Sequence, residues 1–398
     1  MHRAKLGLLT SATIAVLAAA GLAIAHPGHP PITPPEMTFA AHAETIPFQL
    51  FRGNRIVIPV TVGGHRTQAI LDTGASMTTL DRSYARSIGL PEGLKIQGKG
   101  TGGTVDAELV TGVTIDVGAT RLANMSIGVM DLSAVTRSLG RPMTVVLGRD
   151  FFNATVVSID WAASTLEVRS PSAFAPAPGA AALPLARKGP FNTISISVAA
   201  GKPIEALFDL GSDGALALPR SYWETRPDIA NLRWAEARSG GVGGLTPARR
   251  ATVPEVTLAG RTFRAVPTTL SEAGNDTDPT QMANVGIQFL KQFRLDLDLG
   301  RDRVFLTPRS DAPGFDRDRA GARFDLAGDR LKAVFVSPQG PAAQAGLKTG
   351  DEVVAVDGMK VDASFYQRAD WTRGPVGHTV ALARADGSTV KVTLADYF

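Results

Sequence analysis

The sequence predicts a mainly β protein in which two similar β domains precede a small α+β domain. Gly (41 residues) and Pro (26) are abundant and aromatic residues make up 6%, which favours many short strands joined by turns over long helices. Two long segments also repeat the same motifs at one spacing. The 398 residues, of which 44% are hydrophobic and 20% charged, suffice for two or three globular domains.

The N-terminus has the pattern of a secretory signal peptide. Arg3 and Lys5 precede an almost wholly apolar run, residues 6–25, which ends on the small-residue sequence Ala-Ile-Ala. We therefore expect residues 1–25 to be removed and the protein to be exported, either periplasmic or secreted. The alternative is an uncleaved membrane anchor, because the apolar run is about long enough to span a bilayer. Residues 26–44 are Pro-rich, and we expect a disordered or extended leader there.

Two breaks divide the remaining chain into three blocks. Residues 170–184 are rich in Pro, Ala and Ser, and residues 309–319 are charged and contain Pro and Gly, so both segments are predicted to be linkers. The blocks that they separate are residues 45–169, 185–308 and 320–398.

The first two blocks repeat each other. An apolar strand followed by Asp-Thr-Gly-Ala in the first block corresponds to one followed by Asp-Leu-Gly-Ser in the second, and a later Val-Leu-Gly corresponds to Asn-Val-Gly. The spacing stays at 137 or 138 residues (209 − 72 = 137; 286 − 148 = 138). Three signals at one spacing predict a duplicated domain. The corresponding pairs are Asp72 and Asp209, Gly148 and Gly286, and Asp160 and Asp298.

Within each block the pattern predicts hairpins. In the first block, residues 55–62 alternate and end on Gly63-Gly64, and residues 67–71 form the return strand, so that Asp72 lies just past a strand end. Asp81 is predicted to cap a short helix that stops at Gly89. Later hairpins are expected over residues 113–129 and 156–169, with one helical turn after Gly148, and the second block shows the same order.

The composition excludes several kinds of chemistry. The chain has no cysteine, which excludes disulfides, thiol catalysis and cysteine-ligated metals. Outside the signal peptide and the leader only His65 and His378 remain, and neither a G-x-S-x-G nor an H-E-x-x-H motif is present. We therefore expect no metal and no cofactor. The net charge of +4 comes without a basic block, so nucleic acid is not an expected partner. Carboxylate chemistry is what remains for bond cleavage.

Asp72-Thr73-Gly74 follows the apolar pair Ile70-Leu71, has Val146-Leu147-Gly148 downstream, and occurs in two copies. This combination resembles the aspartic peptidases, especially the retropepsin-like branch, over about residues 45–308. The resemblance implies a two-lobed acid-protease fold of β-barrel domains and an endopeptidase that acts on peptides or proteins. It also implies that Asp72 and Asp209 face each other as the catalytic pair, supported by Thr73, Gly74, Gly211 and Ser212.

The need for two copies follows from acid–base chemistry. Two carboxylates a few ångström apart do not both ionise easily, so they share one proton and titrate as a pair, as is established for the aspartic-protease dyad as a class. The ionised member activates a water molecule, and the protonated member polarises the scissile carbonyl group and later donates to the leaving amine. No covalent intermediate is needed, which agrees with the lack of cysteine.

The second copy departs from the family pattern, because Leu210 stands where threonine is usual. In the family that threonine hydroxyl bonds across to the opposite loop, which leaves Thr73 here with only a backbone partner. Three hypotheses therefore stay open. The protein is a monomer with an intramolecular dyad, a non-catalytic peptide-binding protein on a degenerate scaffold, or a homodimer that pairs two copies of Asp72.

Each of the first two blocks also has a glycine-rich stretch, over residues 98–103 and 240–244. These stretches resemble the glycine-rich flap tips of retropepsins, which close over a bound peptide. The alternative is an ordinary flexible loop. The flap glycines are Gly100, Gly102, Gly103, Gly241, Gly243 and Gly244.

The last block resembles a bacterial PDZ domain. The resemblance rests on Ser337 to Asp351 (SPQGPAAQAGLKTGD), which are followed by a predicted strand and by Asp357-Gly358. PDZ domains bind an extended peptide by adding it to the edge of a sheet, so the resemblance implies a peptide C-terminus as a partner. The alternative is a packing module without a ligand. The resemblance places a carboxylate-binding loop at Gly321, Ala322, Arg323 and Phe324.

Overall fold

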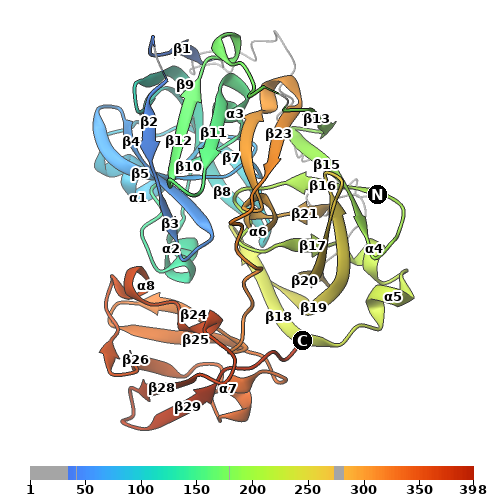
Figure 1. The fold of residues 1–398 in the computed structure, drawn as a ribbon. Helices are drawn as coiled ribbons and strands as arrows, with labels where there is room; N and C mark the ends of the chain where they lie inside the picture. Colours follow the sequence, from blue (N-terminus) through green and yellow to red (C-terminus); the bar gives the residue numbers. More distant parts are fainter. Residues whose placement is uncertain (1–34, 42, 179, 273–281) are drawn as a thin grey trace, which may run out of the picture.

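The computed structural model describes residues 35–398 except 42, 179 and 273–281. The expected signal peptide, residues 1–25, and the start of the leader lie outside the described residues. The described chain is built from four sheets and a few short helices, which confirms the predicted mainly β fold (Figure 1). Within this described part, every helix is too short or too polar to cross a membrane.

Lobe 1 is built on one mixed sheet with the order β1-β9-β6-β10-β5-β4-β8-β7, in which β3 also pairs with β4. Helices α1 (Arg82–Ser87), α2 (Ser133–Leu139) and α3 (Arg149–Ala154) lie between these strands in the chain. The side chain of Asp81 caps α1 by accepting the backbone N–H groups of Ser83 and Tyr84, as predicted. The strands are β1 (Glu36–Thr38), β3 (Gln49–Phe51), β4 (Arg55–Val62), β5 (His65–Leu71), β6 (Thr79–Asp81), β7 (Leu94–Gly100), β8 (Gly103–Val117), β9 (Thr120–Met130) and β10 (Val145–Leu147).

Lobe 2 repeats this arrangement with the order β14-β15-β16-β21-β17-β20-β19-β18. The long hairpin β19 (Gly244–Leu258) and β20 (Arg261–Ser271) matches β8 and β9 in length, at 15 and 11 residues. The other strands are β14 (Ala186–Lys188), β15 (Phe191–Val198), β16 (Ile204–Phe208), β17 (Leu216–Leu218), β18 (Trp234–Gly241) and β21 (Ala283–Val285), and the helices are α4 (Arg220–Trp223), α5 (Pro227–Ala230) and α6 (Ile287–Leu290).

A parallel strand pair in each lobe positions the segment that follows it. In lobe 1, β10 runs parallel to β5 and antiparallel to β6, and in lobe 2, β21 is placed in the same way between β16 and β17. The backbone N–H of Asp72 donates to the carbonyl oxygen of Leu147 at 3.0 Å, and the N–H of Asp209 donates to that of Val285 at 3.0 Å. Both aspartates are therefore held at the end of a buried strand.

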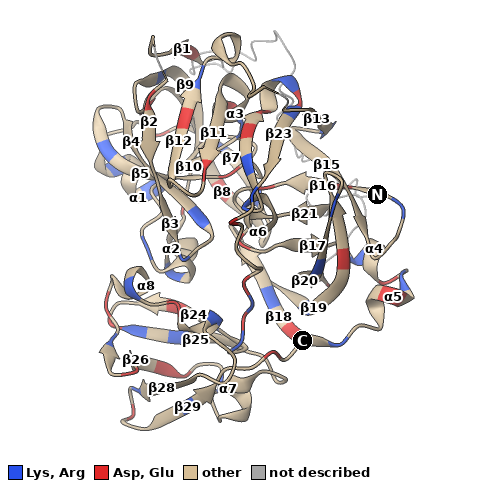
Figure 2. Ribbon diagram, in the orientation of Figure 1, with Lys and Arg blue, Asp and Glu red and all other residues tan. Residues whose placement is uncertain are grey.

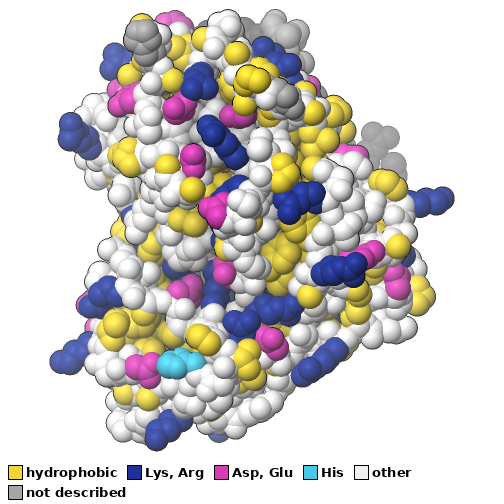
Figure 3. All heavy atoms as spheres, viewed as in Figure 1, with side chains coloured by type: hydrophobic (Ala, Val, Ile, Leu, Met, Phe, Trp, Pro, Cys, Tyr) yellow, Lys and Arg dark blue, Asp and Glu magenta, His cyan; other side chains and the backbone are white. Residues whose placement is uncertain are grey.

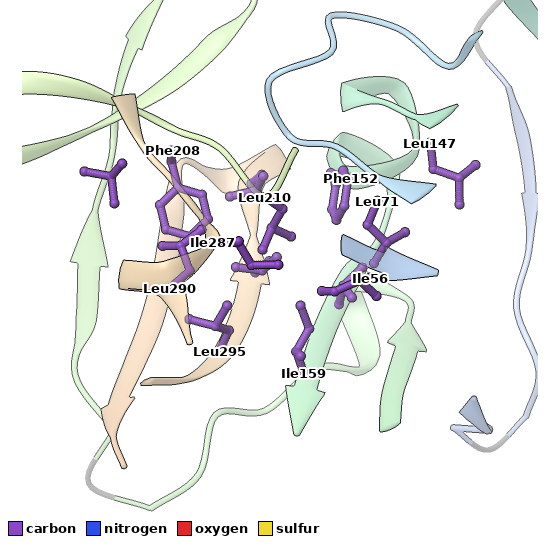
Figure 4. Packing of buried hydrophobic residues seen from close by; sticks show 14 of the residues in the cluster. Ile56, Leu71, Leu147, Phe152, Ile159, Phe208, Leu210, Ile287, Leu290 and Leu295 are labelled. Atoms are coloured by element: carbon purple, nitrogen blue, oxygen red, sulfur yellow. The ribbon is translucent and has the colours of Figure 1, made fainter. Parts of the chain in front are cut away.

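A third sheet joins the two lobes and was not foreseen from the sequence. It has the order β13-β23-β22-β11-β12-β2, and β11 of lobe 1 pairs with β22 of lobe 2. One buried apolar cluster extends through both lobes, including Ile159, Leu210 and Leu295 (Figure 4). The lobes are therefore one packed unit. The strands are β2 (Thr45–Pro47), β11 (Val156–Asp160), β12 (Thr165–Arg169), β13 (Ala182–Pro184), β22 (Phe293–Asp298) and β23 (Arg303–Pro308), with short 3-10 turns at Pro171–Ala173 and Leu299–Arg301.

The C-terminal domain has its own sheet, with the order β24-β25-β26-β28-β29 and β27 paired to β26. Pro341 lies in the first turn of α7, and Gly346 follows this helix with a φ of +88°, as the N-terminal proline and C-terminal glycine preferences predict. The elements are β24 (Ala322–Ala327), β25 (Arg330–Val336), α7 (Pro341–Gln344), β26 (Glu352–Val356), β27 (Met359–Lys360), α8 (Phe365–Arg368), a 3-10 turn (Trp371–Arg373), β28 (Thr379–Arg384) and β29 (Thr389–Thr393).

The C-terminal domain packs directly against lobe 1. Its buried cluster includes Phe51 and Ile70 of lobe 1 together with Tyr366. The guanidinium group of Arg52 stacks on the Tyr366 ring at 4.0 Å from the ring centroid and forms a salt bridge with Asp370 at 3.1 Å. Such partly buried, paired contacts between domains hold their relative orientation.

Candidate active site

The two lobes present their Asp-x-Gly turns to each other. Each glycine lies against the carboxylate of the opposite lobe, since a Cβ atom built on Gly74 would be 2.7 Å from Cγ of Asp209, and one on Gly211 would overlap Asp72. Any side chain at either position would push the two aspartates apart. This contact explains why both copies of the motif keep glycine while the residue before it changes from Thr73 to Leu210.

The backbone around the two carboxylates is symmetric. Oδ1 of Asp72 accepts the N–H groups of Gly74 at 2.8 Å and Ala75 at 3.1 Å. Oδ1 of Asp209 accepts those of Gly211 at 2.8 Å and Ser212 at 3.1 Å. Ser212 thus supports the carboxylate through its backbone. Two N–H donors on one oxygen orient each carboxylate and stabilise negative charge on it.

The side chain of Thr73 links the two lobes by hydrogen bonds. Its hydroxyl group donates to the carbonyl oxygen of Phe208 at 2.7 Å and accepts the N–H of Leu210 at 2.9 Å, so both partners are backbone atoms of lobe 2. The side chain of Leu210 is fully buried and belongs to the apolar cluster that both lobes share (Figure 4). Leu210 therefore replaces the second hydroxyl bridge with apolar packing.

The two carboxylates interact strongly. Burial and, next to it, the charge of Asp209, which lies within hydrogen-bond reach of Asp72, together raise the pKa of Asp72 from 3.8 to about 7, against the opposing effect of Arg55. Asp72 is therefore the member of the pair that holds a proton near neutral pH.

Asn284 distinguishes the two halves of the site and was not among the residues predicted from the sequence. Its amide Nδ2 donates to Oδ2 of Asp209 at 2.6 Å. The matching residue in lobe 1 is Val146, which offers no donor to Asp72. The signal was present in the repeat, where Asn-Val-Gly corresponds to Val-Leu-Gly, because a polar residue at the centre of a buried strand needs a hydrogen-bond partner.

The two glycine-rich stretches meet at the tips of the hairpins β7–β8 and β18–β19. The N–H of Gly102 donates to the carbonyl oxygen of Val242 at 2.9 Å. Side chains on Gly100 or Gly102 would overlap the opposite tip, and Gly241 lies against Thr101. The values of φ are +136° for Gly103, +92° for Gly243 and +116° for Gly244, all in a region that favours glycine. The glycines serve both close approach and turn geometry.

The expected carboxylate-binding loop of the C-terminal domain lies against the lobes. Gly321 has a φ of +72° and packs on Gly340, Ala322 begins β24, and Phe324 is buried in the domain core. Arg323 donates to Oγ of Ser138, on α2 of lobe 1, at 2.8 Å. Helix α2 packs alongside β24, which is an edge strand of its sheet (Figure 1). In this arrangement lobe 1 lies next to the strand edge to which a peptide would add.

Two lobes that each supply one aspartate to a shared site, under paired hairpins, have the arrangement of aspartic peptidases. No group of three or more His, Asp or Glu side chains is placed to hold a metal ion within the parts of the chain that the structure describes.

Comparison with known families agrees with this arrangement. Residues 58–151 match the family model described as aspartyl protease, and residues 335–383 match the one described as PDZ domain. Both resemblances predicted from the sequence are thereby confirmed. A search of the curated proteins found no match. The first match includes Asp72 and Gly148 and ends before lobe 2, so it does not include Asp209.

Proposed function

We propose that this protein is an aspartic endopeptidase in which Asp72 and Asp209 of one chain form the catalytic pair. The observation that carries the proposal is the contact between the two carboxylates, each held by two N–H groups and each touching the glycine of the other lobe. The raised pKa of Asp72 supports a pair that shares one proton.

The asymmetry of the pair assigns the two roles. Asp209 accepts three hydrogen bonds, including that of Asn284, so it carries the negative charge and takes a proton from the attacking water. Asp72 holds the shared proton and gives it to the scissile carbonyl oxygen. When the tetrahedral intermediate collapses and its C–N bond breaks, Asp209 passes its proton to the leaving nitrogen, and Asp72 takes a proton back from one of the two hydroxyl groups of the intermediate, which restores the starting state.

The observations favour the monomeric dyad over the two alternatives. A homodimer would pair two copies of Asp72, but Asp209 of the same chain already contacts Asp72. A degenerate binding protein would have no need for a second aspartate that keeps the same N–H donors and an added Asn284 amide. We also retain export as part of the proposal, and sequencing of the mature N-terminus would identify cleavage after residue 25.

The test is hydrolysis of an unfolded protein at acid and neutral pH by the parent, Asp72→Asn and Asp209→Asn chains. Each variant is expected to lose about 10³-fold or more of kcat/KM, because neither carboxylate acts alone. Circular dichroism serves as the control for folding. Loss in Asp72→Asn alone would favour the homodimer. A folded parent chain without activity would favour the binding protein.

A further inference from the structure

The charges of four arginines act on Asp213, which follows Asp209 by four residues on the same loop, and one of them, Arg55, lies within 4 Å of its carboxylate. They come from separate elements: Arg55 begins β4 of lobe 1, Arg250 lies on the flap strand β19 of lobe 2, and Arg323 and Arg373 belong to the C-terminal domain. The partial loss of hydration among these groups would raise the pKa of Asp213, but the four guanidinium groups together hold it well below its ordinary value.

The charges around Asp213 do not balance. Arg55 lies 3.8 Å from the Asp213 carboxylate, and Arg373 lies 3.9 Å from both Asp316 and Asp370. Over the residues that the structure describes, Arg250 and Arg323 form no salt bridge. The hydrogen bonds of Arg323 go to the neutral Ser138 hydroxyl and, at 3.5 Å, to the carbonyl oxygen of Arg238 on the flap strand β18. Both guanidinium groups therefore interact with the charge of Asp213, and Arg323 also with that of Asp325, but neither has a carboxylate within 4 Å among the described residues.

Arg250 and Arg323 lie near the catalytic pair because both act on Asp213, which is on the same loop as Asp209. Asp213 is exposed whereas Asp209 is buried, so the loop reaches solvent at Asp213. Arg323 on β24 of the C-terminal domain contacts Arg238 on the flap strand β18 of lobe 2, and Figure 2 shows β24 in the domain below the lobes. Lys and Arg side chains gather on the surface where the C-terminal domain meets the lobes (Figure 3).

Lobe 2 has the residues Asp213 and Arg250, whereas the corresponding positions of lobe 1 are uncharged. The repeat places Ser76 of lobe 1 where lobe 2 has Asp213, and Leu109 of β8 where β19 has Arg250. The C-terminal domain adds Arg323, which lies between Ser138 of lobe 1 and Arg238 of lobe 2. The half of the dyad in lobe 1 therefore has no counterpart of Asp213 and Arg250.

We propose that Arg250 and Arg323 form a carboxylate-binding subsite beside Asp213, which selects peptides with an acidic group at one position relative to the scissile bond. The proposal rests on the proposed peptidase function. Guanidinium groups bind carboxylates with charge-assisted hydrogen bonds, and an incoming carboxylate would relieve the repulsion between the two arginines. The acidic group is either a side chain within the substrate or the carboxylate at its C-terminus.

The experiment uses peptides spanning a bond that the full chain cleaves in an unfolded protein. Each flanking position carries Glu in one peptide and Gln in its partner, and each peptide is made with a free C-terminal acid and with an amide. We expect Glu at one position, compared with Gln, or the free C-terminal acid, compared with the amide, to raise kcat/KM about tenfold, which corresponds to about 1.4 kcal/mol. The scan distinguishes the two sources of carboxylate. Equal kcat/KM for all pairs would overturn the proposal.

The variants then assign the preference to its residues. In Arg250→Gln and Arg323→Gln the ratio of kcat/KM between the acidic and neutral peptides should fall toward one, and Arg323→Lys should retain part of it. Arg264→Gln is the matched control, because Arg264 is 82% exposed on β20 and its removal takes the same charge from the same lobe. An unchanged ratio in both glutamine variants would contradict the assignment.

A binding measurement separates this subsite from catalysis. Fluorescence anisotropy with labelled peptides and the Asp209→Asn chain reports affinity when no cleavage occurs. If the parent chain cleaves nothing but the Asp209→Asn chain prefers acidic peptides through Arg250, the peptidase proposal fails and the subsite stands. If the parent cleaves peptides without an acidic preference, the subsite fails and the peptidase proposal stands.

Discussion

Asn284 lies 2.6 Å from the Asp209 carboxylate, on the strand β21 that runs parallel to the strand leading into that aspartate. This single amide breaks the symmetry between two otherwise matched half-sites. Its other atom, Oδ1, has no hydrogen-bond partner among the described residues, so the side chain is held in the site by its bond to Asp209.

The first prediction concerns this amide. Replacing it in Asn284→Val gives lobe 2 the residue of lobe 1 and removes a donor to the charged form of Asp209. We expect kcat to fall about tenfold, because one charge-assisted hydrogen bond is worth about 1.5–3 kcal/mol. The acidic limb of the kcat/KM profile should move to higher pH. An unaltered pH profile would show that Asn284 acts only in packing, and Asn284→Gln tests whether a displaced amide restores the profile.

The second prediction follows from the proton on Asp72. Because burial and the charge of Asp209 raise the pKa of Asp72 to about 7, the singly protonated pair is lost as the pH rises through that value. The rate of peptide hydrolysis should therefore decline above about pH 7, as measured by kcat/KM between pH 3 and pH 9. Activity that increases steadily up to pH 9 would be inconsistent with a shared proton.

The raised pKa of Asp72 also predicts how the stability of the fold depends on pH. In the folded chain Asp72 keeps its proton up to about pH 7, whereas in the unfolded chain it releases the proton near its ordinary value of 3.8. The unfolded state binds fewer protons in that window, so the free energy of unfolding falls as pH rises from about 4 to 7. Asp72→Asn removes this pH-dependent loss of stability, because asparagine has no proton to release. Calorimetry should show a larger gain in Tm from Asp72→Asn at pH 8 than at pH 4, and equal gains would contradict the raised pKa.

The flap tips give a prediction based on close packing. A methyl group in Gly102→Ala would overlap the backbone of Gly244, so the tips must separate. We expect a several-fold rise in KM for peptide substrates with little change in Tm, because the tips are partly exposed. Gly314→Ala is the control, since a Cβ atom on Gly314 has no neighbour within 4 Å. The same KM in both variants would show that tip contact is irrelevant to peptide binding.

The sequence predicted what depends on local pattern and on repetition. The strand before Asp72, the cap at Asp81 and the matching copy around Asp209 all follow from short motifs, and the structure places these elements as expected. The sheet that joins the lobes could not be predicted, because the pairing of β11 with β22 joins residues far apart in sequence whose only signature is ordinary alternation. The Asn284 contact depends on a difference between the two copies, whereas the motifs that predict the duplication are those that the copies share.

The last prediction tests whether the C-terminal domain supports the protease lobes. Gly140 follows α2 with a φ of +75°, and a side chain there would overlap the ring of Tyr366. Gly140→Ala should therefore loosen the contact between lobe 1 and the C-terminal domain and lower the free energy of unfolding by about 2 kcal/mol or more. Gly89→Ala is matched to it, because Gly89 also has a φ of +75° but a Cβ atom there meets nothing within 4 Å. The excess loss in Gly140→Ala, measured by urea unfolding, isolates the overlap with Tyr366 from backbone strain. Equal losses in the two variants would mean that the domains separate in solution. If the excess is present and the acidic-peptide preference declines with it, the position of Arg323 depends on this contact.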